Sequence, residues 1–558
     1  MAMFISRLAS ARRTLLAASI CAAMSGLGAA PRPHTASGNH VTVTSCEDDG
    51  SPGTLRTAIE GASDGDTIDL TGLACSLISL NGPLLVSVPN LTILGPGSGA
   101  LTIDGRDTYR VLQGSNLDII GLTIANGRIS GGSGACVLGN DLSLTNVVLT
   151  HCVNVGAGSA LGGAVFVSGD LTTHGASILG SSAAGATYAM GGAAFVGGSA
   201  MLYDSTITGN TAQAGGMAYG GGISANGAIT LHASVIDGNS AQASIGAAYG
   251  GGLHSSGGDI SILDGSAVSG NTARSDQNHV FGAGIDAGTG TTSTGIVITR
   301  HSTVTGNSAS SACAACLVSG GGVHAFDSID AAYSTFSYNE AVCDDPISQC
   351  GAGGGAMTAL GQSPSSSIAV RNTTISGNNV IGGTAAGAFA AGGGIMAGAG
   401  LQVVARNSTI AFNDAGTLGG GIAATTSAGS PSEIVSTIVA DNHSDGGAGD
   451  ITVSPFGSDL VFEGSKNMVT AAGASVTLPG DTSTEEPLLL PLTTDNGGVT
   501  ATHALAAGSP AIDAGANPDS FVFDQRGFPH HRVVGTVADI GAYEFDSDPS
   551  IFADDFDP

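Results

Sequence analysis

Any acid–base chemistry in this chain of 558 residues would require carboxylates that the fold brings close together. Hydrolysis of a glycosidic bond uses two of them, about 5 to 9 Å apart. The central region contains Asp237, Asp264, Asp327 and Asp330, but none has an acidic counterpart at the equivalent position of a neighbouring sequence repeat. We therefore assign no catalytic residues.

The arginines lead to the same expectation. Cleavage of an acidic polysaccharide by elimination would require acids that hold calcium and an arginine or lysine that removes a proton. The repeats contain four arginines, each in a different unit: Arg274, Arg300, Arg371 and Arg406. The sequence predicts no point at which an arginine converges with several acids.

Calcium is the metal ion that the sequence leaves open. Asp344 and Asp345 lie between Cys343 and Cys350, and calcium prefers oxygen ligands. A solvated acidic loop explains the same residues, and we favour it, so no metal ligands are assigned. The histidines show no ligand spacing and are expected to be mostly solvent-facing strand residues: His151, His232, His254 and His324.

Eight cysteines after residue 30 form pairs that are close in sequence. The pairs are Cys46 with Cys75, Cys136 with Cys152, Cys313 with Cys316, and Cys343 with Cys350. An even number of cysteines in an exported chain favours disulfides. The CAAC motif at 313–316 has the spacing of a redox motif, but it lacks a βαβ context and a basic neighbour, so we expect a local disulfide there.

A recurring motif must position all these residues. Close copies of STITGN (205–210) end at residues 181, 210, 239, 271, 307, 339, 378, 413 and 441. Steps of 28 to 39 residues indicate an array of nine units rather than several ordinary domains. The unit 219–241 contains three short apolar segments, around Ile223, Ile229 and Ile236. Because such a unit cannot bury its apolar face alone, we expect stacked units to form a parallel β-helix with three strands and three corners per unit.

An asparagine closes seven copies of the motif. Stacked coils lie about 4.8 Å apart, so equivalent amides can hydrogen-bond to each other along the axis. Asparagine also tolerates a left-handed backbone, which suits a corner. We predict a structural ladder formed by Asn210, Asn239, Asn271, Asn307, Asn339, Asn378 and Asn413.

Glycine clusters such as Gly220–Gly222 precede the next strand and are expected to be corners. They are not phosphate sites, because neither a helix nor a basic residue follows them. Segments of variable length, such as 272–284 and 340–355, lie between each asparagine and the next glycines. We expect these segments to be loops along one edge, where binding specificity would reside.

Composition and charge restrict the class of partner. Ninety glycines, no tryptophan and a charged fraction of 11% suit stacked short strands. The formal charge is −29, and Lys466 is the only lysine. Nucleic acid and anionic bilayers are therefore not expected partners.

The N-terminus has the order of a secretory signal. Arg7, Arg12 and Arg13 precede the apolar run LLAASICAAM, and small residues follow up to Ala30. This run is shorter than the roughly 20 apolar residues of a membrane span. We therefore expect residues 1–30 to be a signal peptide and the mature chain to be exported without a transmembrane segment. Cys21 does not mark a lipoprotein, because a bulky isoleucine precedes it.

The expected organisation after the signal is an N-terminal cap at 40–66 and β-helix repeats at 67–445. Terminal coils and a linker (446–487), a small C-terminal module (488–546) and an acidic tail (547–558) complete it. The cap is expected to contain a helix with Leu55, Ala58 and Ile59 on one face.

Three motifs of the C-terminal module carry a resemblance to a known family. GSPAIDAG (508–515), DQRGFP (524–529) and DIGAYE (539–544) resemble the choice-of-anchor Q domain found on exported bacterial β-helix proteins, although His530 and His531 stand where a basic residue is expected. The repeats are similar to those of polymorphic outer membrane proteins. The resemblance implies a right-handed β-helix of the pectate-lyase-like kind, secreted or held at the cell surface.

The module also contains Asp513, Asp524, Arg526, Asp539 and Glu544. These residues would suit a metal site or a catalytic cluster. We favour a buried network around Arg526 that fixes the fold of the module.

Together these observations predict an all-β protein, a right-handed parallel β-helix with an N-terminal capping helix, located outside the cell or at the outer membrane. We expect a monomer that binds an extracellular polysaccharide or another cell surface without catalysis. A polysaccharide lyase or glycoside hydrolase with an acidic groove is the alternative. A purely structural spacer is the third possibility.

Overall fold

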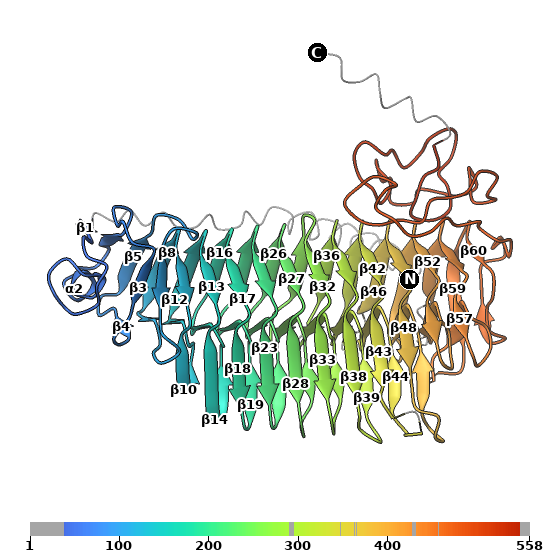
Figure 1. Ribbon diagram of the computed structural model, residues 1–558. Helices are drawn as coiled ribbons and strands as arrows, with labels where there is room; N and C mark the ends of the chain where they lie inside the picture. The colour runs from blue at the N-terminus through green and yellow to red at the C-terminus, as the bar shows by residue number, and fades with distance from the viewer. Residues whose placement is uncertain are drawn as a thin grey trace, which may run out of the picture.

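The chain forms one long parallel β-solenoid (Figure 1). The structure is a computed structural model, and it describes residues 38–288, 295–345, 347–361, 363, 365–426, 431–455 and 457–546. Successive coils pair in register through parallel strands, for example Ile229 with Ile260. The predicted all-β parallel solenoid is therefore confirmed. The expected signal peptide (1–30) and acidic tail (547–558) lie outside the described residues.

Three sheets, named A, B and C, enclose the body of the solenoid. Sheet A contains β1 (His40–Thr42), β2 (Thr67–Asp69), β5 (Asn90–Leu94), β8 (Asn116–Ile120), β12 (Asp141–Thr145), β16 (Leu171–His174), β21 (Ala200–Tyr203), β26 (Ile229–His232), β31 (Ile260–Leu263), β36 (Val297–Arg300), β41 (Ile329–Ala332), β46 (Ser367–Arg371), β51 (Gln402–Arg406), β55 (Ser432–Val435), β59 (Leu460–Ser465) and β61 (Val476–Thr477). Sheet B contains β3 (Leu77–Ser79), β6 (Thr102–Asp104), β9 (Thr123–Ala125), β13 (Val148–Thr150), β17 (Ser177–Leu179), β22 (Thr206–Thr208), β27 (Val235–Asp237), β32 (Ala267–Ser269), β37 (Thr303–Thr305), β42 (Thr335–Ser337), β47 (Thr374–Ser376), β52 (Thr409–Ala411), β56 (Ile438–Ala440) and β60 (Met468–Val469). Sheet C contains β4 (Leu84–Leu85), β7 (Leu112–Gln113), β11 (Val137–Gly139), β15 (Val165–Val167), β20 (Ala194–Val196), β25 (Ile223–Ala225), β30 (Leu253–Ser255), β35 (Ile285–Ala287), β40 (Val323–Ala325), β45 (Met357–Ala359), β50 (Ile395–Ala397), β54 (Ile422–Ala424) and β58 (Ile451–Val453).

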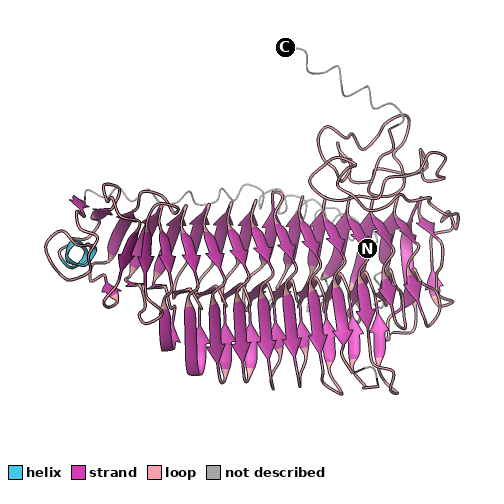
Figure 2. Cartoon of the chain, in the orientation of Figure 1, coloured by secondary structure: helices cyan, strands magenta, loops and turns pink. Residues whose placement is uncertain are grey.

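A fourth sheet, D, projects from the body as a ridge along most of its length (Figure 2). The ridge contains β10 (Arg128–Ser133), β14 (Val153–Leu161), β18 (Ser182–Gly185), β19 (Tyr188–Met190), β23 (Thr211–Ala214), β24 (Met217–Tyr219), β28 (Ser240–Ala243), β29 (Ala248–Tyr249), β33 (Thr272–Ser275), β34 (Val280–Phe281), β38 (Ser308–Ser311), β39 (Leu317–Ser319), β43 (Glu340–Cys343), β44 (Gly351–Gly353), β48 (Asn379–Ile381), β49 (Phe389–Ala391), β53 (Asp414–Ala415) and β57 (His443–Ser444).

The ridge corrects the expectation of three strands and an edge loop per unit. The unit that starts at Ile223 crosses sheets C, A and B and then adds two ridge strands, β28 and β29. The segments that the sequence presents as loops are therefore mostly strands. Their sequences hide this because the interior of the ridge is filled mainly by alanine, as at Ala212, Ala241 and Ala273, which has low β-propensity.

Inward-facing apolar residues alternate with outward-facing residues along the strands of sheets A, B and C, and this alternation forms the core of the body. In β26, Ile229 and Leu231 point inward and are fully buried, while Thr230 and His232 face outward. Inward-facing valine, leucine and isoleucine of sheets A, B and C form one continuous apolar cluster from Val43 to Val469. At about 25 cal/mol per Å² of buried apolar area, this cluster is the main source of stability.

The predicted asparagine ladder is present and is longer than expected. The Nδ2 group of Asn239 donates to Oδ1 of Asn271 at 3.0 Å, and Asn271 donates in the same way to Asn307 at 2.9 Å. The series continues through Asn413 to Asn442 and ends on the carboxylate of Asp450. Each ladder amide also donates to a backbone carbonyl, as Asn271 does to Ile236.

The reason given for the asparagine needs one correction. The left-handed residue is not the asparagine but the residue before it, as at Gly238 (φ 60°) and Gly270 (φ 60°). The asparagine itself is buried at the root of the ridge, where Gly252 lies so close that an added Cβ would be 3.0 Å from the amide carbon of Asn271. Gly and Asn therefore have separate tasks in the motif: Gly turns the chain and Asn bonds the coils.

A short helix and a compact module accompany the coils. Helix α2 (Leu55–Glu60) buries Leu55, Ala58 and Ile59 and lies at the blue end of the solenoid (Figure 1). The segment 488–546 does not continue the coils. It packs on the outer side of sheet B near the other end of the solenoid, where Leu505, Ala511 and Ile540 contact Ile438 and Met468.

All four predicted disulfides are formed. Cys46–Cys75 joins residues on either side of helix α2, and Cys136–Cys152 joins the residue before β11 to a residue between β13 and β14. Cys313–Cys316 and Cys343–Cys350 lie in the ridge, in neighbouring coils.

We predict that Asn271→Leu destabilises the solenoid on the order of 3–5 kcal/mol, because buried donors and an acceptor lose their partners. The backbone N–H and Nδ2 of Asn239 both donate to Asn271 Oδ1 and would be left unsatisfied. Thr272→Ala is the matched control, since Thr272 is an exposed neighbour on β33. Urea unfolding monitored by circular dichroism measures the free energy of unfolding of both variants. Equal losses of stability would contradict a stabilising role of the asparagine ladder.

Disulfide removal should depend on the length of chain that the bond closes. Cys46–Cys75 has a sequence separation of 29 and Cys313–Cys316 one of 3. Loop entropy gives about 3–4 kcal/mol for the first and about 2 kcal/mol for the second. The double serine variant at 46 and 75 should therefore unfold at lower urea concentration than the one at 313 and 316. If the 313 and 316 variant unfolded at the lower urea concentration instead, the entropy of the closed loop would not determine which disulfide stabilises the protein more.

Candidate functional site

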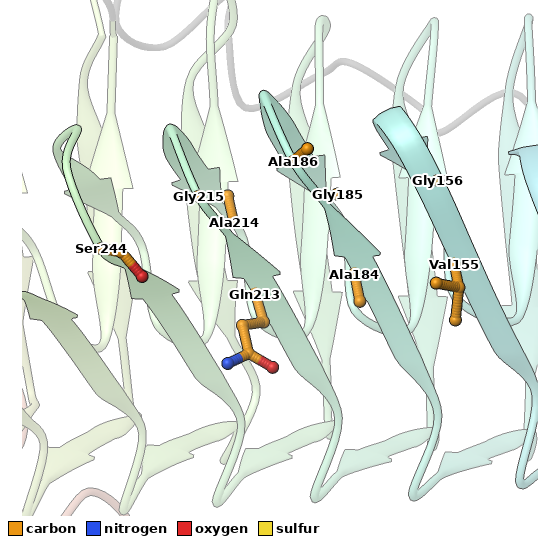
Figure 3. A pocket seen from close by; sticks show the side chains of 9 residues that line it. All are labelled: Val155, Gly156, Ala184, Gly185, Ala186, Gln213, Ala214, Gly215 and Ser244. Carbon is orange, nitrogen blue, oxygen red and sulfur yellow. The ribbon is translucent and has the colours of Figure 1, made fainter.

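The outer wall of the ridge carries a shallow depression of about 300 Å³. It crosses four successive coils and is lined by Val155, Gly156, Ala184, Gly185, Ala186, Gln213, Ala214, Gly215 and Ser244. Figure 3 shows the strand of Ala184 between the strands that carry Val155 and Gln213. The floor is therefore made of small side chains, and the rim is made of one apolar and one amide side chain.

Backbone packing in the ridge produces the small floor. An added Cβ at Gly185 would lie 2.1 Å from the carbonyl oxygen of Tyr188, on the returning ridge strand. At Gly215 it would lie 2.5 Å from the carbonyl oxygen of Ala186 in the previous coil. Glycine is thus required where the ridge turns, and the hollow follows from that requirement.

The side chains that line the depression are small, apolar or uncharged polar. None of the lining residues has a titratable side chain, so the depression offers no general acid or base. Val155 is 41% exposed, and the amide of Gln213 can both donate and accept hydrogen bonds. With coils about 4.8 Å apart, four coils present a repeating surface roughly 14 Å long.

Titratable side chains converge elsewhere, in the seam between sheet C and the ridge. His254 and His324 each place Nδ1 on the carboxylate of Asp286, at 2.8 and 2.7 Å, and all three side chains are buried. The expectation that these histidines face solvent is wrong. Tyr219, Tyr249 and Phe281 of the ridge cover them with ring contacts of 4.9 to 5.9 Å.

This polar cluster joins the ridge to the body. Burial raises the pKa of Tyr249 to about 12, and the nearby Tyr219 and Asp286 add to the shift. Nε2 of His324 has no hydrogen-bond partner among the described residues. Sequence could have identified the three residues, since each is the second residue of the strand after a glycine corner, in GGLHS, GAGIDA and GGVHA.

The expectation that no arginine meets several acids is also wrong. Asp330 accepts from Arg300 at 2.6 Å and from Arg371 at 2.7 Å on the outer face of sheet A. Arg406 holds Glu433 at 2.7 Å and Asp519 of the module at 2.5 Å. The sequence contained a signal for this row: Arg300, Arg371 and Arg406 each stand two residues before the Ser or Thr that begins a motif copy.

This charge row is a docking contact. Arg371 and Arg406 also contact Asp519 of the module, so the row joins the module to sheet A. The other acids considered have local partners: Asp237 accepts from Ser269, and Asp264 contacts His232. Asp327 accepts from the hydroxyl of Ser366.

The acidic ridge loop holds an ion pair. Asp344 contacts Arg274 of an earlier coil, and Asp345 accepts from the backbone of Ile347. Within the described ranges, no group of three or more His, Cys, Asp or Glu side chains is arranged to hold a metal ion.

The network predicted around Arg526 is formed inside the module. Arg526 donates to Asp524 at 2.6 Å and to the carbonyl oxygen of Glu544, and it lies 3.9 Å from the Tyr543 ring centre. The sequence analysis missed Arg532, which is fully buried and donates to Glu544 at 2.9 Å.

Charge is not balanced in this network. Two guanidinium groups face three carboxylates, those of Asp524, Asp539 and Glu544. Burial raises the pKa of Glu544 to about 7, with Asp539 adding to the shift and Arg532 opposing it. Burial raises the pKa of Asp539 as well.

We predict that the module loses stability as pH rises from about 4.5 to 7. The folded state holds a proton on Glu544 that the unfolded chain, with an ordinary glutamate pKa near 4.3, has already released, so ΔG of unfolding falls with pH across this window. Thermal melts of the Glu544→Gln variant should lose this component of the pH dependence. Glu433→Gln, a surface contact of Arg406, is the control, and an unchanged slope in Glu544→Gln would contradict the assignment.

Among the residues that the structure describes, no helix is long and apolar enough to cross a bilayer. Comparison with known protein families gives no matching family model, and no curated protein matches the chain.

Proposed function

We propose that this protein is an exported, surface-associated solenoid that binds an extended, uncharged polymer, such as a neutral polysaccharide, along the outer wall of its ridge. The observation that carries the proposal is the depression between Val155 and Ser244, which crosses four coils and has no titratable lining residue. A polymer laid along the axis would meet similar backbone groups at each coil, with valine, alanine and glutamine at the equivalent positions 155, 184 and 213.

Three further features support this proposal. The N-terminal 30 residues have the pattern of a secretory signal, and the four disulfides suit an oxidising compartment. The formal charge of −29 disfavours acidic polysaccharides as ligands. The motifs at 508–515, 524–529 and 539–544 resemble those of exported bacterial β-helix proteins, which is the basis for placing the protein at the cell surface.

We predict that Gln213→Ala weakens polysaccharide binding roughly three- to tenfold, which corresponds to the net loss of one or two hydrogen bonds. Ala184→Trp, which fills the floor, should weaken it more. Gln242→Ala is a matched control, because Gln242 pairs in register with Gln213 but does not line the depression.

The measurement is affinity electrophoresis in gels that contain one neutral or acidic polysaccharide each, with reducing ends and unsaturated products assayed in parallel. Retardation by neutral polymers that the two depression variants lose, and the control keeps, supports the proposal. Steady release of new chain ends would instead favour a lyase or hydrolase. If no polymer retards the protein, the binding proposal is wrong, and a purely structural spacer is the reading that remains.

A further inference from the structure

Two exposed aromatic side chains stand at the corner between sheet B and the ridge. Tyr338 follows β42 and Phe412 follows β52, and these residues are 58% and 43% exposed. Because β42, β47 and β52 pair in register, Tyr338, Gly377 and Phe412 occupy the same corner of three successive coils. The two rings are therefore two coils apart on one line along the axis, and we name these three residues the aromatic corner.

Backbone geometry disfavours bulky side chains at this place. Tyr338 and Phe412 both have a left-handed backbone, with φ of 55° and 58°, which residues with large side chains rarely adopt. Glycine, also left-handed, occupies the equivalent place in six other coils, at Gly180, Gly209, Gly238, Gly270, Gly306 and Gly377. Strain that is retained to present an exposed side chain points to a function of that side chain.

Neighbouring residues hold both rings in place. The ring of Tyr338 lies over Gly377, where an added Cβ would be 2.7 Å from Cε1 of the tyrosine. The ring of Phe412 contacts the imidazole of His503 in the module, with 5.0 Å between the ring centres. Each ring is thus supported on one side and open to solvent on another. A ligand that packs on such supported rings loses little of its binding energy to ordering them.

Each ring has a carboxylate two residues further along the chain. Glu340 begins β43 and Asp414 begins β53, and both residues are exposed. Asp441, exposed as well, has the equivalent corner place in the coil after Phe412. In the part of the chain that the structure describes, the one cationic side chain paired with these three acids is His443, 3.0 Å from Asp414. Aromatic faces and carboxylates both attract ammonium and guanidinium groups, so the aromatic corner is complementary to a cationic ligand.

The spacing of the two ring–carboxylate pairs selects the backbone of that ligand. Two coil steps span roughly 9.6 Å at about 4.8 Å per step. Side chains on one face of an extended strand lie roughly 6.6 or 13 Å apart, and neither distance fits. A polyproline II helix has three residues per turn and rises about 3.1 Å per residue, so every third side chain lies on one face, roughly 9.3 Å from the next. Segments in this conformation also pack on aromatic surfaces.

We propose that the aromatic corner binds a proline-rich, basic segment of a partner protein in the polyproline II conformation, with lysine or arginine at positions i and i+3. One cationic side chain packs on Tyr338 beside Glu340, and the other packs on Phe412 beside Asp414. The contact is independent of polymer binding, because Ser244, the last residue that lines the depression, lies three coils before Tyr338.

Fluorescence anisotropy of labelled synthetic peptides with the full chain, at low ionic strength, tests the proposal. We expect the peptide PKPPKP to bind roughly five- to tenfold more tightly than PKPKPP, since only the first places both lysines on rings. The two peptides have the same composition and charge. PQPPQP, which has no cationic side chain, should not bind.

Tyr338→Gly is the decisive variant, because glycine is the residue that six other coils have at this place. It should weaken binding of PKPPKP roughly five- to tenfold without lowering the melting temperature, and Glu340→Gln should weaken binding as well. Tyr188→Ala removes a ridge tyrosine that is 40% exposed, and Glu60→Gln removes an exposed acid of helix α2. Both are matched controls that should bind like the wild type.

Several results would overturn the proposal. The two lysine peptides could bind equally or not at all, or Tyr338→Gly could bind PKPPKP like the wild type. A lower melting temperature of Tyr338→Gly would assign the ring to packing instead of recognition. Displacement of the peptide by a neutral polysaccharide would assign the two rings to the polymer site.

Discussion

Vertical register is the constraint on which the rest of this structure depends. Each strand residue lies about 4.8 Å from its equivalents in the coils above and below, so a buried polar group can be satisfied by a copy of itself. An asparagine amide meets this condition because it donates and accepts along one line. The chain Asn210, Asn239, Asn271 and onward is thus one repeated solution to a single problem.

A repeated donor must end on something that only accepts. The ladder closes on Asp450, whose other oxygen accepts from Thr470 and from the backbone of Ala471. A second ladder runs in the opposite direction near the other end, from Asn116 to Asn90 and then to the carboxylate of Asp64. In both ladders the last amide N–H group donates to a carboxylate. Negative charge is favourable at this end because the N–H groups of the aligned amides point toward it.

The sequence predicted the parts of the fold that vertical register controls. The motif spacing was sufficient to predict the parallel coils and the ladder, and nearness in sequence was sufficient for the disulfides. It was not sufficient for the ridge, because β28 and β33 have interiors of Ala241 and Ala273, and alanine carries little strand signal. The His254, Asp286 and His324 cluster was missed because its members are 32 and 38 residues apart and meet only when the glycine corners of successive coils are aligned as well.

Alignment also explains why titratable groups and the candidate binding wall are in different places. The seam must fill the angle between two sheets, so it takes large rings and lets Asp286 accept from two imidazoles. The wall must let strands turn tightly, so it takes glycine and alanine and remains open. Charged groups elsewhere on the solenoid pair with carboxylates of nearby coils, as Arg300 does with Asp330 and Arg274 with Asp344. Between Val155 and Ser244 no charged side chain lines the depression, so the wall there is neutral and shallow and offers hydrogen-bonding and apolar groups.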